Sequence, residues 1–291
     1  MAKTGERDQL GTAEGAVLGR AAHVIHAESP ILQDTWAVEL LTPEAQSLVR
    51  DPDYPGASMI WDGFDTSPLF ALNIGSLRYA EDEVERSIRD GIGQYVILGA
   101  GFDTYALRRS GLPSDFRVYE VDHPDVQALK RERIASAKAT PASVPVFVPV
   151  DFESATLRAG VQASGFETER PCVLSWMNTI PYLTAEATEA TLGELSDLMA
   201  PGSRLVLNYG CDVTLTADQA RYLQELQSRV SQSGEPLRSG WKPEVFEETL
   251  GKFGFRVMDH ATEEDLFQRY FTGRRDGLRP AVPARLIVAE R

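Results

Sequence analysis

Two glycines close together follow a short apolar run near residue 100. The run 96–98 leads into Gly99, Ala100 and Gly101, and Asp103 follows. Glycines at this spacing remove the side chains that would keep a ligand away from the backbone of a turn. A phosphate-binding loop would need a third glycine or a Gly-Lys-Ser/Thr ending, and Asp103 would repel phosphate. If the segment is more than a tight structural turn, it favours a ligand with a cationic amino group.

Acidic residues stand at the ends of the next two apolar runs. Glu120 and Asp122 lie 21 and 23 residues beyond Gly99, the spacing at which a carboxylate holds a ribose diol. Asp151 and Phe152 follow a third run, where a carboxylate and an aromatic ring suit adenine. Each acid alone is also typical of a helix cap. Together these three segments predict adenosine with a cationic amino-acid tail and no phosphate, which describes S-adenosyl-L-methionine.

Short apolar runs that alternate with helical stretches must position these residues. The predicted strands span residues 95–100, 117–122, 144–150, 171–177, 203–209, 255–260 and 284–290. This alternation predicts an α/β fold, in which helices cover both faces of a seven-stranded, mostly parallel sheet. In such a sheet the ligand lies at the carboxyl ends of the strands, where the chain order reverses.

Helix signals support the same organisation. Residues 12–28 are compatible with one helix, whereas residues 51–58, with two prolines and a glycine, predict a loop. His123-Pro124 begins a helix with Val126, Leu129, Ile134 and Ala137 near one face, and Thr184 caps a helix that stops at Pro201-Gly202. We expect an N-terminal helical lid over residues 1–90, and a ligand-binding domain over residues 91–291 with a cap insertion at about 211–243.

Composition excludes several classes of protein. Lys and Arg number 29 against 43 Asp and Glu, and the net charge of −14 disfavours binding to nucleic acid. No apolar run approaches the roughly 18 residues of a membrane span, and the N-terminus does not resemble a signal peptide, so we expect a cytoplasmic protein without a membrane partner. Two cysteines and four scattered histidines offer no disulfide framework and no metal site. A monomer and a homodimer are both open.

The same residues resemble the class I S-adenosyl-L-methionine-dependent methyltransferases. More narrowly, the chain resembles the leucine carboxyl methyltransferase family, in the branch of bacterial O-methyltransferases that tailor polyketides and other natural products. The most specific matching stretches are LGAGFDT (98–104) and YEVDHP (119–124). The resemblance covers almost the whole chain, through RYAEDEV, VPVDF, SWMNTIPYLT and GEPLRSGWKPEVFEETLGKFGF, and through the looser matches TAEGAVLGRAAH and RYFTGRRDGLRP. The resemblance implies a Rossmann-like class I methyltransferase fold.

The resemblance also assigns residues to the parts of the cofactor. The glycine turn (residues 99–101) and Asp103 would hold the methionine moiety, Asp122 the ribose, and Asp151 with Phe152 the adenine. Arg20 and Arg78 resemble the basic residues that grip the cofactor's carboxylate, a role that suits a guanidinium. In this chain GSLRYAED replaces the commoner RTRYAED-like form.

The segment SWMNTIPYLT contributes further residues. Ser175 and Trp176 are expected beside the cofactor, and Asn178 and Tyr182 beside the methyl acceptor. Met177 stands where many relatives carry a glutamate, and a thioether cannot accept a carboxylate's hydrogen bonds, so that contact is absent or supplied elsewhere. Trp176 and Met177 equally suit the core of a buried strand.

The acceptor pocket is expected to be apolar. Trp61 and Trp241 suit a planar or apolar small molecule, and would equally suit an ordinary core. A carboxylate acceptor needs no base, whereas a phenol gains from one, and His26 is the chosen candidate because the lid is expected to fold over the cofactor. A local basic cluster at residues 269–279 either attracts an anionic acceptor or pairs with neighbouring acids, and we favour pairing.

Three functions are consistent with these features. The leading one is an S-adenosyl-L-methionine-dependent O-methyltransferase that acts on a hydroxyl or carboxyl group of a small, polyketide-like molecule. The second is a protein C-terminal carboxyl methyltransferase. The third is a non-methylating relative that keeps the cofactor pocket as a scaffold for another reaction or for binding.

Overall fold

One mixed sheet organises the chain. A computed structural model describes residues 12–61, 67–151, 156–232 and 237–291. The strands are β1 (Gln94–Leu98), β2 (Arg117–Asp122), β3 (Val146–Pro149), β4 (Val173–Trp176), β5 (Arg204–Gly210), β6 (Arg256–Thr262) and β7 (Ala284–Glu290). Each strand coincides with one of the seven predicted runs. The α/β prediction is therefore confirmed.

The order of the strands creates a reversal in the middle of the sheet. The order is β3-β2-β1-β4-β5-β7-β6, and β7 alone runs antiparallel to its neighbours. From β1 the chain proceeds to β2 and β3 on one side, whereas from β4 it proceeds to β5 on the other. Connections that leave in opposite directions open a crevice at the carboxyl ends of β1 and β4. Both strands are buried at every residue, as expected for the centre of a parallel sheet.

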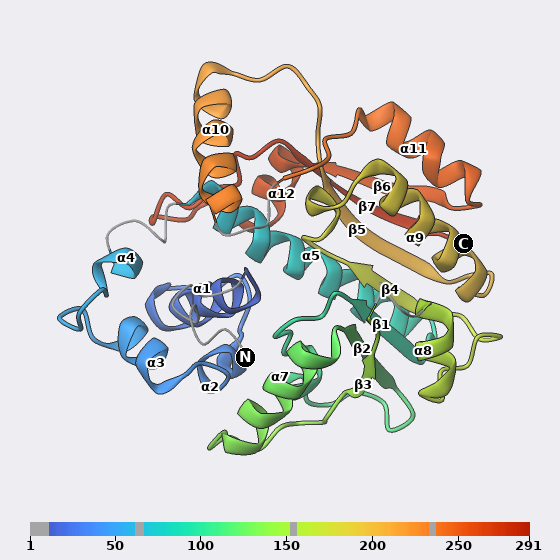
Figure 1. Cartoon of the computed structure of the whole chain (residues 1–291), viewed down its shortest axis with the longest axis horizontal. Coiled ribbons are helices and arrows are strands. Elements are labelled where there is room, and N and C mark those ends of the chain that lie inside the picture. Colours follow the sequence, from blue (N-terminus) through green and yellow to red (C-terminus); the bar gives the residue numbers. More distant parts are fainter. Residues whose placement is uncertain (1–11, 62–66, 152–155, 233–236) are drawn as a thin grey trace, which may run out of the picture.

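Helices cover both faces of the sheet (Figure 1). One face carries α8 (Leu157–Ala163), α9 (Ala185–Leu198) and α11 (Pro243–Lys252) in one core cluster. The opposite face carries α5 (Pro68–Arg89), α6 (Tyr105–Arg108) and α12 (Glu263–Tyr270) in a second cluster. Along β1, Tyr95 and Ile97 belong to the second cluster, and Val96 and Leu98 to the first, because successive side chains of a strand point to opposite faces.

The helix that follows β4 has the predicted ends. A short 3-10 turn (Ile180–Tyr182) leads from the strand to Thr184, whose side chain accepts a hydrogen bond from the backbone N–H of Ala187 and caps α9. Gly202 follows the helix with a φ of +83°, a backbone conformation that favours glycine. The predicted cap and stop signals of this helix are therefore confirmed.

The helix α7 (Pro124–Ser136) begins where the sequence predicts but buries other side chains than expected. Leu129, from the predicted apolar face, is 38% exposed, whereas Gln127 and Lys130 are buried. The Gln127 amide donates hydrogen bonds to the carbonyl oxygens of Glu120 (2.8 Å) and Val148 (3.2 Å), and Lys130 pairs with the Glu120 carboxylate. The helix therefore docks on the sheet edge through polar contacts, which an apolar pattern does not reveal.

Four helices form a unit beside the sheet (Figure 1). They are α1 (Thr12–His26), α2 (Thr35–Glu39), α3 (Pro43–Arg50) and α4 (Ser58–Trp61), and their buried side chains share a third core cluster. Phe102 and Leu107, which follow β1, belong to this cluster and attach the unit to the sheet. By contrast, α5 packs in a cluster of the sheet. The predicted lid of residues 1–90 therefore ends in a helix that belongs to the sheet's own layers.

The predicted cap insertion, residues 211–243, contains one long helix, α10 (Ala217–Gln232). An isolated β-bridge between Cys211 and Trp241 joins the two ends of the insertion. The hydroxyl of Tyr222, on α10, accepts a hydrogen bond from the backbone N–H of Leu69 at 3.2 Å. The helix α10 therefore stands over the N-terminal end of α5 (Figure 1).

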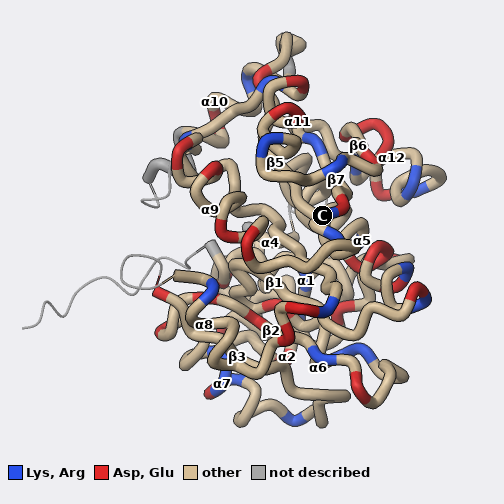
Figure 2. Tube along the Cα trace, turned by 90° about the vertical axis from the view of Figure 1, so that its right-hand side faces the viewer, with Lys and Arg blue, Asp and Glu red and all other residues tan. Residues whose placement is uncertain are grey.

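Charged residues of both signs are interspersed along the chain (Figure 2). The local basic cluster at residues 269–279 consists of paired arginines: Arg269 with Asp259, Arg274 with Asp276, Arg275 with Glu28 and Arg279 with Glu264. Pairing, the favoured alternative for this cluster, is what the structure contains. In the part of the chain that the structure describes, no helix has the length and apolar character to cross a membrane.

Close packing between α5 and α12 gives a test of this arrangement. At Gly75, in α5, a Cβ would lie 2.8 Å from Cδ2 of Leu266 and 3.1 Å from the ring of Phe271. We expect Gly75→Ala to lower the free energy of unfolding by about 1–3 kcal/mol, because the added carbon forces the helices apart. Gly251→Ala in α11 is the control, since nothing lies within 4 Å of the added carbon. Urea denaturation measures both, and equal effects would contradict the proposed packing.

Candidate functional site

A cavity of about 690 Å³ lies at the carboxyl ends of the central strands. Its polar end is formed by the glycine turn after β1, by Asp122 at the end of β2, and by Ser175 on β4. From there it extends between α5 and the cap insertion, past the ends of β4 and β5. This is the crevice that the reversal of strand order creates.

The glycine turn opens the polar end of the cavity. Gly99 and Gly101 have φ values of +68° and +49°, which residues other than glycine rarely adopt. The backbone N–H of Gly99 donates to the carbonyl oxygen of Val121 at 2.9 Å, and this bond fixes the turn to β2. A Cβ at Gly99 would lie 3.0 Å from Oγ1 of Thr179, so Thr179 packs against the turn at this point. The turn therefore brings bare backbone to the site, as the sequence predicts.

Asp122 lies beside this turn and belongs to the lining. One carboxylate oxygen accepts a hydrogen bond from the backbone N–H of Gly101 at 2.6 Å, and the other accepts one from the N–H of His123 at 2.7 Å. A carboxylate oxygen can accept more than one hydrogen bond. Asp122 is therefore held in place by the backbone and still has lone pairs for the hydroxyl groups of a ligand. Asp103 also lines the cavity, and Oδ1 accepts a hydrogen bond from the N–H of Tyr105 at 2.7 Å.

Glu120 does not reach the cavity, contrary to expectation. Its side chain is 1% exposed and forms an ion pair with Lys130, which is fully buried. Gln127 and Lys130 of α7 contact Glu120, whereas Asp122 is the last residue of the strand. The predicted pair of ribose-binding carboxylates is therefore reduced to Asp122.

Asp151 and Phe152 are the residues predicted to contact adenine. Phe152 lies outside the described residues. Asp151 is partly buried, and the described lining of the cavity does not include it. The assignment of these two residues to adenine stays a prediction.

The two arginines chosen from the sequence lie in different environments. Arg20, on α1, lines the cavity, is 8% exposed and forms an ion pair with Asp34 at 2.7 Å. Arg78, on α5, pairs with Asp82 one turn further along the same helix, and its side chain is 41% exposed. The described lining does not include Arg78. Of the two, only Arg20 is therefore placed to contact a ligand in the cavity.

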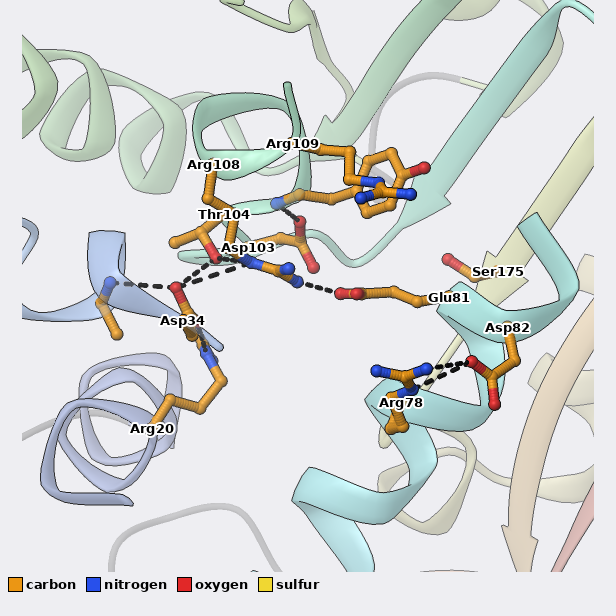
Figure 3. Close-up of polar contacts among 12 residues, drawn as sticks. Arg20, Asp34, Arg78, Glu81, Asp82, Asp103, Thr104, Arg108, Arg109 and Ser175 are labelled. Atoms are coloured by element: carbon orange, nitrogen blue, oxygen red, sulfur yellow. Dashed lines mark hydrogen bonds and ion pairs between the residues drawn. The ribbon is translucent and has the colours of Figure 1, made fainter. Parts of the chain in front are cut away.

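Behind Arg20 lies a group of buried charges that sequence analysis did not identify. Arg108, on α6, contacts the carboxylate of Glu81 and lies 3.7 Å from that of Asp34 (Figure 3). Glu81 lines the cavity from α5. Burial raises the pKa of Glu81 to about 7, although the charge of Arg108 opposes the shift. Glu81 stands within the matching stretch RYAEDEV, but its position inside the fold depends on how α5 packs.

Residues at the end of β4 divide between the cavity and the core. Ser175 lines the cavity and its hydroxyl lies 2.9 Å from that of Tyr95. Trp176 points to the opposite face, is 1% exposed and packs in the core cluster with α9 and α11. The alternation of side chains along a strand explains this separation. The expectation that Trp176 faces the cofactor is thus corrected to a core role.

The loop after β4 is held in an unusual conformation. Asn178 lines the cavity and has a φ of +58°, and it is the only described residue other than glycine with a positive φ. Its backbone N–H donates to Oδ1 of Asn208 at 2.6 Å, and its side chain contacts Ser76 on α5. Tyr182 also belongs to the lining. The predicted acceptor residues Asn178 and Tyr182 therefore lie together at the site.

The two tryptophans predicted for the acceptor pocket lie elsewhere. Trp61 is 41% exposed on α4, and its indole N–H donates to the carbonyl oxygen of Leu48 at 3.1 Å. Trp241 is buried with its ring edge-on against Phe246, in the core behind β5. The described lining includes neither tryptophan. Their aromatic character suits packing as well as binding, so composition alone does not distinguish the two roles.

Apolar side chains form the wall of the cavity that faces α5 and the cap insertion. They are Leu69, Leu72 and Leu77 from α5, Leu223 and Leu226 from α10, Leu237, and Val282 from the segment before β7. Asn73 and Gln227 add polar groups to the same wall. The cap insertion therefore contributes leucines to the cavity wall, whereas Trp241, its residue predicted for the pocket, is not in the described lining.

The histidines do not line the cavity in the described part of the chain. His26, the predicted base, packs against the Trp61 ring at a tilt of 39°, and its Nε2 lies 2.7 Å from the carbonyl oxygen of Val49. His23 is 2% exposed, and its Nε2 accepts a hydrogen bond from the N–H of Ile31 at 2.9 Å. Both face a separate hollow formed with residues 270–278. His26 is therefore not placed to act as a base at this site.

Three further groups in the lining stay protonated at neutral pH. Burial raises the pKa of Tyr95, Tyr209 and Cys211, the last to about 12. These groups can donate hydrogen bonds but do not serve as bases near pH 7. Within the described ranges, no group of three or more His, Cys, Asp and Glu side chains is arranged to hold a metal ion.

Comparison with known proteins relates this architecture to one family. A family model described as leucine carboxyl methyltransferase matches residues 13–196. A Bacillus subtilis relative, named as the S-adenosyl-L-methionine-dependent methyltransferase YktD, is 29% identical over 69% of this chain and 66% of its own length. A Mycobacteroides abscessus relative with the same type of name is 30% identical over 68% of this chain and 66% of its own. The matched region thus spans slightly under two thirds of these relatives.

Solved structures share the fold at low sequence identity. A Thermobifida fusca protein, titled as a methyltransferase, has a TM-score of 0.58 and 16% identity, over 98% of this chain and 96% of that one. A DUF574 family protein from Streptomyces avermitilis has a TM-score of 0.55 and 14% identity, over 95% of this chain and 97% of that one. The similarity extends to the N-terminal helices as well as the sheet.

The buried state of His23 leads to a prediction on acid stability. Burial, aided by the charge of Arg274, lowers the pKa of His23 from 6.5 to about 4. A lowered pKa means that stability present above pH 6.5 is lost as the pH falls towards 4, by up to about 3 kcal/mol. We expect His23→Gln to lose less unfolding free energy than the wild type over this range.

Urea denaturation at a series of pH values measures this difference. His123→Gln, at the half-exposed start of α7, is the control for the loss of an imidazole group. Parallel pH profiles for the wild type and His23→Gln would contradict the role of His23.

Proposed function

We propose that this chain, which belongs to the leucine carboxyl methyltransferase family, transfers a methyl group from S-adenosyl-L-methionine to an oxygen atom of a small, largely apolar molecule. The oxygen belongs to a carboxyl or hydroxyl group. One observation carries the proposal: a single cavity joins a polar end at the tips of β1, β2 and β4 to an apolar wall from α5 and α10. Such a cavity suits a polar donor and an apolar acceptor side by side.

The polar end fits the donor on four counts. The glycine turn lines this end of the cavity and presents backbone without side chains at Gly99 and Gly101. Asp122 offers a fixed carboxylate to a pair of ribose hydroxyls. Arg20 offers a guanidinium to a carboxylate, with which it forms strong charge-assisted hydrogen bonds. The same end carries the acids Glu81 and Asp103, which suit a ligand bearing an ammonium group.

The chain's own residues would act mainly by orientation. When bound, S-adenosyl-L-methionine supplies an electrophilic methyl group on a positively charged sulfur. The leucines of α5 and α10 exclude water and hold an apolar acceptor beside the polar end. Asn178 and Tyr182 line the same cavity, and their polar groups can orient the acceptor oxygen. Positioning of this kind contributes much of the acceleration of a bimolecular reaction.

The state of the acceptor oxygen decides whether a base is required. An ionised carboxylate is a nucleophile at neutral pH, whereas a hydroxyl must lose a proton. Glu81 is held in its ion pair with Arg108 at the donor end. A phenolic hydroxyl must therefore enter as its anion, and its rate should rise with pH from about 7 to about 10. A carboxylate acceptor should show a rate that is level over the same range.

Incubation of the full chain with methyl-labelled S-adenosyl-L-methionine tests the function. The acceptors are aromatic and aliphatic acids, each paired with the phenol or alcohol of the same skeleton, and peptides with a free C-terminal carboxylate. We expect labelled ester or ether from the small molecules and none from the peptides. Labelled peptide would instead support the protein carboxyl methyltransferase. Donor binding without any transfer would support the scaffold alternative.

Removal of the Asp122 carboxylate tests the donor site separately. We expect Asp122→Ala to weaken the binding of S-adenosylhomocysteine by about 1–3 kcal/mol, because hydrogen bonds to a charged acceptor are lost. Calorimetric titration measures the affinity. Asp125→Asn is the control, since this carboxylate lies in the next turn of chain and is 92% exposed. Unchanged affinity in Asp122→Ala would remove Asp122 from the ribose role.

A further inference from the structure

Asp34 is a fully buried carboxylate that connects three segments of the chain. It precedes α2, and its residue exposure is 0%. It accepts hydrogen bonds from Nε of Arg20 at 2.7 Å, from the backbone N–H of Ala37 at 3.0 Å and from the hydroxyl of Thr104 at 2.6 Å. Nε of Arg108 lies 3.7 Å away (Figure 3). The contacts thus come from α1, from α2 and from the segment between the glycine turn and α6.

These contacts fix the position of the Arg20 guanidinium. Nε bonds to Asp34, and Nη2 donates to the carbonyl oxygen of Phe102, directly after the glycine turn, at 2.5 Å. Among the described residues, the hydrogen bonds of Arg20 use these two nitrogens, and Nη1 has no partner. Because Arg20 lines the cavity, its remaining N–H groups are available to a ligand there. When Nε and Nη2 of a guanidinium are fixed by hydrogen bonds, its remaining N–H groups are held in one orientation for a ligand.

Asp34 also neutralises the charge of Arg20, in addition to fixing its position. A buried arginine without a counter-ion is strongly disfavoured. A long side chain that is still mobile loses much rotamer entropy when a ligand fixes it in one place. Asp34 supplies the counter-charge and the fixed acceptor together. Its own position is fixed from the sheet side by Thr104, which is 2% exposed, and from the helix side by Ala37. Arg20 is thereby aligned with the glycine turn rather than only with α1.

We infer that Asp34 is a positioning residue, which holds Arg20 beside the glycine turn so that Arg20 binds the carboxylate of the donor's amino-acid part. This inference rests on the proposed function. Asp34 is expected to strengthen the binding of the ligand's amino-acid part, through Arg20, and to leave the binding of the nucleoside part unchanged.

Two ligands that differ only in this tail provide the test. S-adenosylhomocysteine carries the amino-acid group, whereas 5′-methylthioadenosine keeps the nucleoside and the thioether without it. Calorimetric titration of the full chain gives both affinities for the wild type, Asp34→Asn, Arg20→Gln and the double variant. We expect each single variant to bind S-adenosylhomocysteine about 10- to 100-fold more weakly, with at most about a twofold change for 5′-methylthioadenosine.

The double variant separates positioning from an independent role. Because Asp34 acts through Arg20, the double variant should bind S-adenosylhomocysteine no more weakly than Arg20→Gln alone. Additive losses would overturn the inference. Equal losses for both ligands would also overturn it, since they indicate general damage to the site. Unchanged affinity in Asp34→Asn would show that Arg20 needs no support.

A second substitution covers the case in which Asp34→Asn does not fold. Thr104→Val keeps the volume but removes the hydroxyl that bonds to Asp34, and it should cause a smaller loss with the same selectivity for the tail. The matched control is Asp82→Asn, which breaks the Arg78 pair outside the cavity and should leave both affinities unchanged. A wild type that binds neither ligand would refute the proposed function itself. A wild type that binds both, with unselective variants, would refute only the role of Asp34.

Discussion

The reversal of strand order between β1 and β4 is the constraint on which the rest of this structure depends. Because connections leave the two strands in opposite directions, the carboxyl ends of the sheet open into the cavity at this point. The chain uses the opening in two ways. Glycines after β1 bring backbone to its floor, and helices from both ends of the sequence, α1 and α10, supply its walls.

Buried charge imposes a second requirement. Asp34, Glu81, Arg108 and Arg20 lie close together in a region from which water is largely excluded, and each charge depends on its partners for the solvation it has lost. Such a group contributes little net stability compared with apolar packing, but it restricts each side chain to few arrangements. That restriction is useful where a flexible arginine must meet a ligand in one orientation. The hydrophobic clusters thus hold the layers together, and the charges fix the details at their junction.

Much of the fold could be predicted from the sequence, and the site only in part. The strands were predictable because central parallel strands leave continuous apolar runs, and Gly99, Gly101 and Asp122 were predictable because backbone geometry and strand ends fix their places. The prediction that Glu120 contacts the ligand was wrong because α7 packs against this residue through polar contacts. The predicted places at the site were wrong for three rings, Trp61, Trp241 and His26. Residue type alone does not tell whether a ring faces a ligand or a neighbouring side chain. Asp34 and Arg108 were missed because their importance arises only from tertiary contacts.

The position of β7 in the sheet has a consequence for synthesis. Residues 284–290 pair with β5 on one side and β6 on the other, so β6 at the sheet edge has β7 as its sheet neighbour. During translation β6 leaves the ribosome before β7, its sheet neighbour. The backbone N–H and C=O groups of β6 therefore stay unpaired until β7 has been synthesised. Edge strands in that condition readily recruit other chains. Slow translation or truncation near the last strand would therefore expose an aggregation-prone intermediate, whereas the β1–β5 part of the sheet can already form.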